Sequence, residues 1–328
     1  MFGVCIVTFA SEDVIASCLD SLRGSEDQGF RVVILDNAST DATCDRIRDW
    51  VAGTQWSFAE QELAEGAPAG ANSKLTLLRS GQNLGFAGGV NRCLEAFNED
   101  PEVAYFWVLN PDSEATPKTI GAYRKMAETA GDFALMGGRT IYHETPDTIQ
   151  SDGGRVNFWT GICSNLNQGQ HPREAMMPPA PQVDFISGAN MVASRLFLSR
   201  VGPMQEDYFL FYEEVDWAQR RGELPLLLCK DAAVYHHGGT AIGSGSTTRR
   251  ATGFANYFNY RNRMRFVWRF RPYAIPVAYA YSLLKIVKLL LLGAWREAVG
   301  AFRGLHQLPP PAEVYQRISW PPPKRPRR

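Results

Sequence analysis

The stretch GVCIVTFASEDVIASCLDSLRGSEDQGFRVVILDNASTD, residues 3–41, decides the fold class. It opens with a continuous apolar run over residues 3–9, which is typical of a strand buried on both faces. Apolar side chains then recur at helical spacing over residues 11–22, where Ser11 is the expected N-cap. A second apolar run follows over residues 30–35. Strand, helix and strand in this order predict the start of a parallel α/β sheet.

The alternation of strands and helices continues to about residue 150. Further elements are expected as a helix over 41–51, a strand over 75–78, a helix over 87–97, a strand over 103–109 and a helix over 117–130. Later strands are expected within residues 183–192 and 224–235. Residues 52–72, rich in Ala, Gly and Glu, predict a surface excursion, and residues 151–183, rich in Gly, Asn, Gln and Pro, predict loops around an active site.

The composition argues against a dedicated nucleic-acid binder and favours a reducing compartment. The 34 Lys and Arg residues balance 34 Asp and Glu residues, so the formal net charge is zero. The six cysteines form no Cys-x-x-Cys pair and no zinc spacing, so we expect buried free thiols. The first residues run into an apolar strand without the basic segment of a signal peptide, which favours the cytoplasm.

Polar residues follow the expected strands, where ligands bind in open parallel sheets. Asp36 can accept hydrogen bonds from a ribose hydroxyl or a base edge, or it can cap the following turn. Asp112 follows Pro111 and is placed to hold Mg²⁺ or Mn²⁺, which favour carboxylate oxygen; the alternative is a plain Pro-Asp turn.

A glycine-rich stretch, NLGFAGGVN at residues 83–91, leads into a helix. Glycine lets the backbone approach a ligand closely, and a helix N-terminus favours negative charge. The stretch has neither the dinucleotide-binding spacing nor the Gly-Lys-Ser/Thr of a P-loop, so it is a weak signal taken alone.

Titratable residues gather at two later positions. Glu213, Glu214 and Asp216 follow an aromatic run, and like charges this close raise at least one pKa, as a general base requires. The alternative is an acidic helix start. His236 and His237 follow an apolar strand and can ligate a cation or hydrogen-bond a diphosphate, or can form a structural pair.

The apolar segment 273–294 is long enough to span a bilayer, but Pro276 and two lysines argue against a simple span. One side of its helical wheel carries Tyr281, Lys285, Lys288 and Arg296. This pattern favours a helix lying in the membrane interface, over a buried core or dimer helix and over a true span. The basic tail at 321–328 adds attraction to anionic lipid, or is a solvated end.

Taken in order, these motifs resemble family 2 glycosyltransferases, in particular the bacterial rhamnosyltransferase-like group. The matching stretches are residues 6–9, 35–41, 83–91, 109–112, 187–191, 212–217 and 236–239, and residues 258–263 also resemble a stretch after the catalytic domain. The resemblance implies a GT-A fold, a Rossmann-like, mostly parallel sheet flanked by helices, with a C-terminal helical, membrane-associating extension. The implied division is a catalytic domain at 1–245, a helical extension at 246–305 and a Pro-rich basic tail at 306–328.

The resemblance also implies site residues. The implied contacts to the nucleotide sugar are Thr8, Glu12, Asp36, Asn83, Gly85, Asn91, Asn110 and Asp112. The acceptor is expected beside Gly188, Ala189 and Trp217, a Mg²⁺ or Mn²⁺ ion on Asp112, His236 and His237, and the base among Glu213, Glu214 and Asp216, with Glu214 foremost. Two positions depart from the family pattern: Asn110 replaces the first Asp of the Asp-x-Asp motif, and Glu214 replaces the Asp of Glu-Asp-x-Asp.

The implied activity is an inverting transfer of a sugar, with deoxythymidine-diphosphate rhamnose as the suggested donor, to a polysaccharide or lipid-linked saccharide. The expected location is the cytoplasm, at the inner face of the cell membrane, with a homodimer as one arrangement. One alternative is a nucleotidyltransferase, which usually carries Arg and Lys in a glycine-rich loop after the first strand, whereas residues 8–12 here are acidic. The other alternative is a non-catalytic sugar-nucleotide sensor.

Overall fold

A computed structural model describes residues 1–63, 70–98, 100–238 and 250–315. Ten strands of the described residues form one sheet: β1 (Phe2–Thr8), β2 (Phe30–Asp36), β3 (Phe58–Glu62), β4 (Leu75–Arg79), β5 (Tyr105–Leu109), β6 (Ser113–Ala115), β7 (Leu135–Tyr142), β8 (Ile149–Ser151), β11 (Asn190–Ser194) and β12 (Leu226–His236). Their order is β3-β4-β2-β1-β5-β11-β7-β12-β6, with β8 paired to β7, and a separate hairpin joins β9 (Gly154–Asn157) to β10 (Ile162–Asn165).

The first half of the sheet is parallel, as the sequence predicts. β1 pairs in parallel with β2 and with β5, and β4 continues the parallel pairing beyond β2. β11 then enters antiparallel between β5 and β7, so the sheet as a whole is mixed but mostly parallel. The expected α/β class is confirmed.

Helices cover both faces of the sheet, because each central strand alternates its apolar side chains between two cores. The helices of this part are α1 (Ile15–Arg23), α2 (Thr43–Ala52), α3 (Gly85–Ala96), α4 (Thr119–Ala130), α5 (Arg195–Val201) and α6 (Glu213–Gln219). On β1, Val4 and Ile6 join the core with side chains of α1, α2 and α4, whereas Cys5 joins the core with α3. All six cysteines are free thiols and four are buried, as expected.

Three local predictions are corrected. Residues 52–72 contain an edge strand, β3, which pairs with β4 although its sequence is polar. Backbone hydrogen bonds to the neighbouring strand hold an edge strand, so a hydrophobic sequence is not required. The predicted loops at 151–183 contain the β9–β10 hairpin. Ser11 does not cap a helix: its carbonyl accepts the N–H groups of Val14 and Ile15, and α1 begins after this turn.

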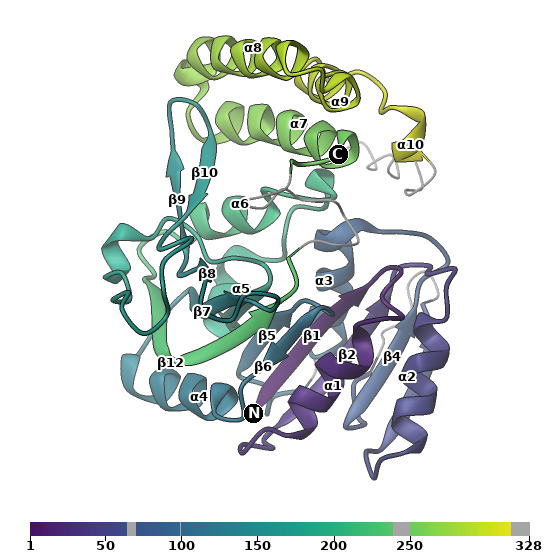
Figure 1. Ribbon diagram of the computed structural model, residues 1–328. Helices are drawn as coiled ribbons and strands as arrows, with labels where there is room; N and C mark the ends of the chain where they lie inside the picture. Colours follow the sequence, from purple (N-terminus) through teal and green to yellow (C-terminus); the bar gives the residue numbers. More distant parts are fainter. Residues whose placement is uncertain (64–69, 99, 239–249, 316–328) are drawn as a thin grey trace.

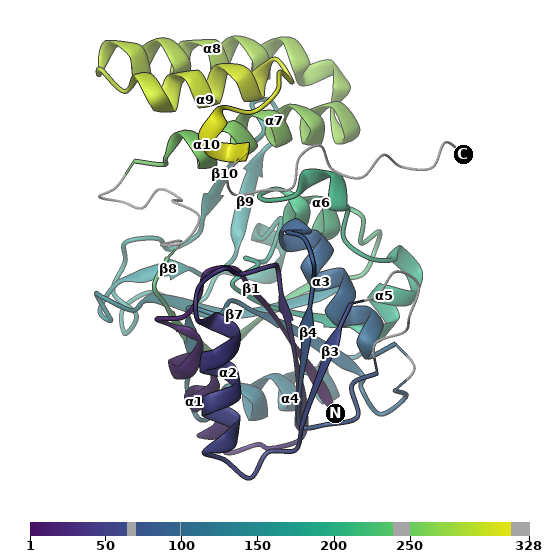
Figure 2. The same cartoon turned by 90° about the vertical axis from the view of Figure 1, so that its right-hand side faces the viewer.

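The C-terminal helices form a separate layer at one end of the molecule, with α8 (Ile275–Leu291) outermost (Figures 1 and 2). The other members are α7 (Gly253–Phe270), α9 (Trp295–Leu305) and the short α10 (Ala312–Tyr315). α9 lies directly on α7, because a Cβ at Gly300 would be 2.2 Å from the carbonyl oxygen of Gly253, and one at Gly304 would be 2.1 Å from that of Tyr257. These two glycines therefore permit backbone contact between the helices.

The predicted boundary between residues 245 and 246 lies outside the described residues, as does most of the predicted basic tail. The described beginning of that tail is packed: Val314 on α10 is fully buried in a cluster with Phe254, Tyr257 and Phe258 of α7. The division into a catalytic domain and an extension therefore stays a prediction.

Candidate active site

The ends of β1 and β2 hold a buried carboxylate. The pairing register places Thr8 beside Asp36. The Thr8 hydroxyl donates a hydrogen bond to Oδ1 of Asp36 at 3.0 Å, and the backbone N–H of Ser39 donates to Oδ2 at 3.0 Å. Asp36 thus caps the turn after β2, and it is also held at the carboxyl edge of the sheet where a ligand is expected. Nearby, Glu12 accepts the backbone N–H of Ala42 through Oε2 at 2.8 Å.

The glycine-rich turn before α3 is tied to this edge. Asn37 donates from Nδ2 to the carbonyl of Gly85 at 3.0 Å, and Oδ1 of Asn83 accepts the N–H of Gly85 at 2.9 Å. Gly85 has a φ of +75°, and a Cβ there would be 2.4 Å from the carbonyl oxygen of Phe209. The glycine is therefore required by the close approach of the chain at Phe209, whose carbonyl accepts the N–H of Phe86 at 2.7 Å.

Asn91 takes a packing role in place of the predicted nucleotide contact. Its side chain is 2% exposed. Nδ2 donates to the Met204 carbonyl at 3.0 Å and to Glu206 at 2.9 Å, while Oδ1 accepts the N–H of Met204 at 2.9 Å. These three bonds use both amide hydrogens and one lone pair of the oxygen, so this buried side chain holds the chain after α5 against α3.

Asp112 and His236 meet after β5 and at the end of β12. Oδ1 of Asp112 lies 3.1 Å from Nε2 of His236, and Nδ2 of Asn110 lies 3.2 Å from the same nitrogen. Nδ1 of His236 lies 2.7 Å from Oε1 of Gln150. Because an amide oxygen only accepts, Nδ1 carries a proton whether or not Nε2 does. With a proton on Nε2 the ring pairs with the Asp112 carboxylate, and without it the ring presents an Nε2 lone pair beside that carboxylate. A carboxylate oxygen and an imidazole nitrogen facing each other in this way are a donor set for a divalent cation.

The charge on Asp112 is favoured by its surroundings. Burial by itself would raise the pKa of the Asp112 carboxyl, but the charge and the hydrogen bond of His236 outweigh it, and the pKa falls below its ordinary value. Asp112 therefore remains ionised in spite of being buried.

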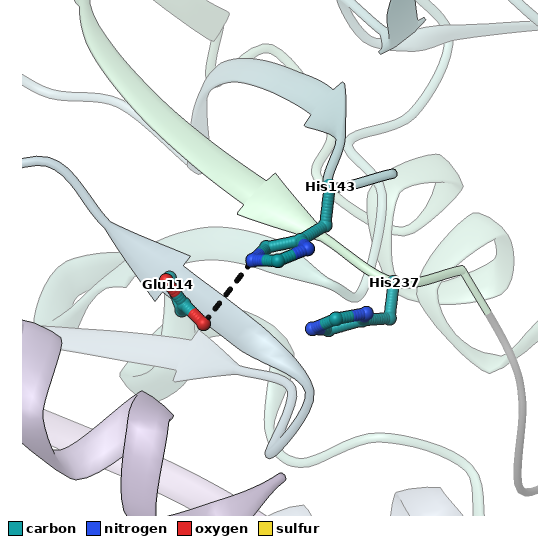
Figure 3. Close-up of side chains that lie close together, drawn as sticks. All are labelled: Glu114, His143 and His237. Carbon is teal, nitrogen blue, oxygen red and sulfur yellow. Dashed lines mark ion pairs between the residues drawn. The ribbon is translucent and has the colours of Figure 1, made fainter. Parts of the chain in front are cut away.

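His237 belongs to a different group. Its Nδ1 lies 2.8 Å from Oε1 of Glu144, and its ring stacks on that of His143 with centroids 3.8 Å apart. The structure therefore divides the predicted cation ligands: Asp112 and His236 come together, and His237 lies with His143 and Glu114 (Figure 3).

The two small residues predicted at the acceptor site lie at the same edge, whereas Trp217 does not reach it. The carbonyl of Ala189 accepts the N–H of Asn110 at 3.2 Å, and a Cβ at Gly188 would be 3.1 Å from the ring of Phe86. Trp217 is fully buried, and its indole N–H donates to the Gly202 carbonyl at 2.9 Å. The prediction that Trp217 contacts the acceptor is therefore corrected: this side chain packs in the core.

The three acidic candidates for the base are in three different environments. Glu213 is 2% exposed, its Oε2 is a buried atom with no partner among the described residues, and burial raises its pKa well above the ordinary value. Glu214 is half-buried, and burial raises its pKa to about 7. Asp216 is fully buried and paired with Arg220 at 2.7 Å and Arg269 at 3.1 Å. Of the three carboxylates, only Glu214 is both partly exposed to solvent and has a pKa near neutrality, which suits proton transfer.

The chain leading to these carboxylates is strained and clamped. Phe209, Phe211 and Tyr212 all have positive φ, between 65° and 74°, which non-glycine residues rarely adopt. The fully buried amide of Asn262 on α7 holds this segment, donating from Nδ2 to the carbonyls of Tyr208, Leu210 and Phe211 at 2.8, 2.7 and 3.0 Å. The clamp sets the position from which α6 and its glutamates begin.

Two site residues were not predicted with a role. Asn262 lies in the stretch 258–263, which resembles the family without indicating what its side chains contact. Gln150 is a single polar residue in a predicted loop region, and no pattern in the sequence distinguishes it from a solvated glutamine. Both act through partners more than 50 residues away, which only the fold reveals.

The chain is similar to several known proteins. Residues 3–173, more than half of the chain, match the model of glycosyl transferase family 2. An N-acetylglucosaminyl-diphospho-decaprenol L-rhamnosyltransferase of Mycobacterium tuberculosis is 25% identical over 261 residues, 73% of this chain and 77% of the relative. The low-salt glycan biosynthesis hexosyltransferase Agl10 of Haloferax volcanii is 21% identical over 263 residues, 80% of this chain and 73% of the relative. A mannosyltransferase of Pyrobaculum calidifontis, solved with GDP-Man and Mn²⁺, superposes with a TM-score of 0.53 at 13% identity, covering 93% of this chain and 86% of the other.

The clamp at residues 208–211 is testable through Asn262. Asn262→Ala removes the side-chain donor shared by three carbonyls, of which that of Tyr208 keeps the N–H of Leu210 at 2.8 Å. We expect the variant to lower the free energy of unfolding by about 2–3 kcal/mol, since an unpaired buried polar group costs about 1–3 kcal/mol. Asn259→Ala, a half-buried position on the same helix, is the matched control. Urea unfolding followed by circular dichroism measures both. Equal stability of the two variants would contradict the clamp.

Proposed function

Because this chain belongs to glycosyl transferase family 2, we propose that it transfers a sugar from a nucleoside diphosphate to a lipid-linked saccharide by a single displacement with inversion. The GT-A fold and the enzyme class, a glycosyltransferase, are confirmed by the family match and the structural likeness. The nucleotidyltransferase alternative is not supported by the family match.

The observation that carries the proposal is a continuous set of contacts along one edge of the sheet. Asn37, next to Asp36, bonds to Gly85, and the neighbouring Phe86 bonds to Phe209 at the start of the acidic segment. Gly188 lies against Phe86, and the next residue, Ala189, bonds to Asn110. Asn110 in turn contacts His236, the partner of Asp112. The groups suited to bind a nucleotide, to bind a cation and to transfer a proton therefore lie on segments that contact one another directly.

Glu214 is the proposed general base. As the acceptor hydroxyl oxygen bonds to the anomeric carbon, its proton passes to the Glu214 carboxylate, and the bond from that carbon to the diphosphate oxygen breaks with its electron pair leaving on the diphosphate. Glu213, with a pKa raised well above its ordinary value, stays protonated and leaves Glu214 as the carboxylate that titrates near neutrality.

Asp112 and His236 are the proposed ligands for Mg²⁺ or Mn²⁺. The facing Oδ1 and Nε2 atoms fit a divalent cation, and Gln150 fixes the ring so that Nε2 is the ligating nitrogen. A cation held there supplies positive charge that offsets the charge of the diphosphate. The mannosyltransferase that shares the fold was solved with Mn²⁺, which supports this choice.

The proposed donor is deoxythymidine-diphosphate rhamnose, and the proposed acceptor carries a polyprenyl diphosphate. The sugar and the acceptor are drawn from the similar mycobacterial protein, a rhamnosyltransferase of N-acetylglucosaminyl-diphospho-decaprenol, and the nucleotide from the resemblance of the sequence to the rhamnosyltransferase-like group. An acceptor of this kind stays in the membrane, so the enzyme has to work at the membrane surface.

The outer face of α8 is the proposed membrane contact. Among the described residues, the helical stretch Pro272–Leu291 is long and apolar enough to span a bilayer, yet one side of α8 packs through Ala278, Ser282 and Ile286. The opposite side, which we term the outer face, exposes Val277, Leu284, Val287 and Leu291. Large aromatic side chains are also exposed on the neighbouring elements, as expected at a membrane interface: Trp268 on α7, Tyr273 before α8, Trp295 on α9 and Trp159 between β9 and β10.

This membrane contact is compatible with the active site. The N-terminus of β1 lies at the end of the molecule far from α8, so β1 runs toward the helical layer and its carboxyl end points to it (Figure 1). α7 joins the two regions, because its Asn262 holds the acidic segment. With α8 lying in the plane of the membrane and Lys285 and Lys288 near lipid headgroups, the proposed location is the inner face of the cell membrane, as a peripheral protein.

Glu214→Gln is expected to lower kcat about 10²–10⁴-fold while sparing donor binding, because an amide cannot accept the proton. In the wild type, kcat/KM should fall as the pH drops through about 7, where Glu214 becomes protonated. Steady-state transfer over a panel of nucleotide sugars measures both, with the exposed Glu223→Gln as control. Wild-type turnover in Glu214→Gln would remove it as the base, and binding without turnover in the wild type would favour a sensor.

Asp112→Asn and His236→Gln should weaken Mn²⁺-dependent binding of dTDP, UDP or GDP at least about tenfold, because each removes one ligand of the cation. Titration calorimetry with and without Mn²⁺ measures the effect. Asp147→Asn, at an exposed position, should bind like the wild type. An undiminished response to Mn²⁺ in Asp112→Asn would place the cation elsewhere.

The double variant Leu284→Glu and Leu291→Glu should bind vesicles of anionic phosphatidylglycerol at least about tenfold more weakly than the wild type. Burial of each Leu contributes about 1.5–3 kcal/mol, and the added charges repel the surface. Met176→Glu, at an exposed apolar position outside the helical layer, is the control for cosedimentation. Undiminished binding of the double variant would exclude the outer face of α8.

A further inference from the structure

A second group of ligand-type side chains lies beside the Asp112–His236 pair. Glu114 is on β6, His143 follows β7 directly, and His237 follows β12 directly. The register makes them neighbours, because β12 pairs with both other strands and sets His236 opposite Tyr142 and Tyr235 opposite Glu114. Three strand ends therefore bring together side chains that are up to 123 positions apart in the sequence (237 − 114).

The donor atoms of this group converge. Nε2 of His143 lies 3.3 Å from Oε1 of Glu114, and one ligand atom from each of the three residues lies within 4.8 Å of the others. The two imidazole rings are stacked with planes 25° apart. Figure 3 shows that both rings turn a nitrogen toward the side on which Glu114 lies.

A further carboxylate orients one ring. Oε1 of Glu144 lies 2.8 Å from Nδ1 of His237 and accepts its proton, so the lone pair of the neutral ring is on Nε2, the nitrogen directed into the group. A carboxylate bonded to the non-ligating nitrogen of a histidine is a usual supporting contact of metal sites.

We propose that Glu114, His143 and His237 bind a transition-metal ion of the Zn²⁺ or Co²⁺ type, in a site separate from the Asp112–His236 pair. Two imidazole nitrogens and one carboxylate oxygen are the ligands that such ions prefer over Mg²⁺, and they leave a fourth position open. Ligand atoms bound to one ion lie about 3–3.5 Å apart, given metal–ligand bonds of about 2.0–2.2 Å. The side chains are half-buried, and binding of a shared ion requires the two stacked imidazole rings to turn toward it.

The two sites are distinct because His236 and His237 have different partners. His236 contacts Asn110, Asp112 and Gln150, whereas His237 contacts His143 and Glu144. Successive residues of an extended chain point to opposite sides, so the adjacent imidazoles do not share an ion.

The sites are nevertheless linked through the backbone. The N–H of His143 donates to the carbonyl of His236 at 3.1 Å, and the N–H of His237 donates to the carbonyl of Asp112 at 3.1 Å. An ion holding the side chains of His143 and His237 would thereby stiffen the chain that positions Asp112 and His236. The role of the second site is therefore support of the first.

Binding of Co²⁺ to the metal-free full-length chain, without any nucleotide sugar, tests the proposal. The visible absorption of Co²⁺ should show a site with nitrogen and oxygen ligands that persists in Asp112→Asn, the variant that removes the other proposed cation site. In the Asp112→Asn background, adding Glu114→Gln or His143→Gln should weaken binding of this ion at least about tenfold. His306→Gln, at a histidine on the distant C-terminal layer, should bind Co²⁺ like the wild type.

Undiminished Co²⁺ affinity in both double variants, with folding verified by circular dichroism, would overturn the proposal. Loss of the Co²⁺ signal in Asp112→Asn would also overturn it, because the ion would then lie with Asp112 and His236. The measurement involves no sugar transfer, so its outcome is independent of whether the proposed activity holds.

Discussion

The parallel pairing of β1 with both of its neighbours is the constraint on which the rest of the structure depends. It sets Thr8 beside Asp36 and Ile6 beside Leu109, so all three strands end at the same edge. The residues that follow them, including Asn110 and Asp112, are then delivered to that edge by the chain itself. Close packing on β1 maintains this arrangement, because a Cβ at Gly89 of α3 would be 2.6 Å from the side chain of Val7. A larger residue there would move the helix that closes the edge.

The C-terminal helices contact the proposed active site through α7. Asn262 of α7 satisfies three carbonyls of a segment whose backbone is otherwise unfavourable, and that segment carries the acidic helix. α9 touches α7 through glycine, and α8 covers both. The outer face of α8 and the proposed base therefore belong to parts of the chain that are connected by packed helices.

The predicted site residues that follow a buried strand lie at the expected edge of the sheet, whereas two that sit inside helices lie in the core. Asp36, Asp112 and His236 lie at strand ends, and their position follows from the pattern of apolar runs. Asn91 and Trp217 match family motifs but lie on helix faces turned into the core, where they bond to Met204 and Gly202. A helical residue can face a ligand or the core with the same neighbours in sequence, so the motif alone does not distinguish the two.

The amino-acid sequence by itself determined the fold class, the order of the first strands and helices, and the chemical character of the edge, because apolar periodicity and strand-end residues are local properties of the chain. Only the tertiary structure decided which groups act together. The partition of His236 and His237 between two groups, the hold of Asn262 on the acidic segment and the pKa of Glu214 near 7 depend on contacts between distant residues and on burial. Burial and long-range contact are properties of the packed chain, and no local pattern encodes them.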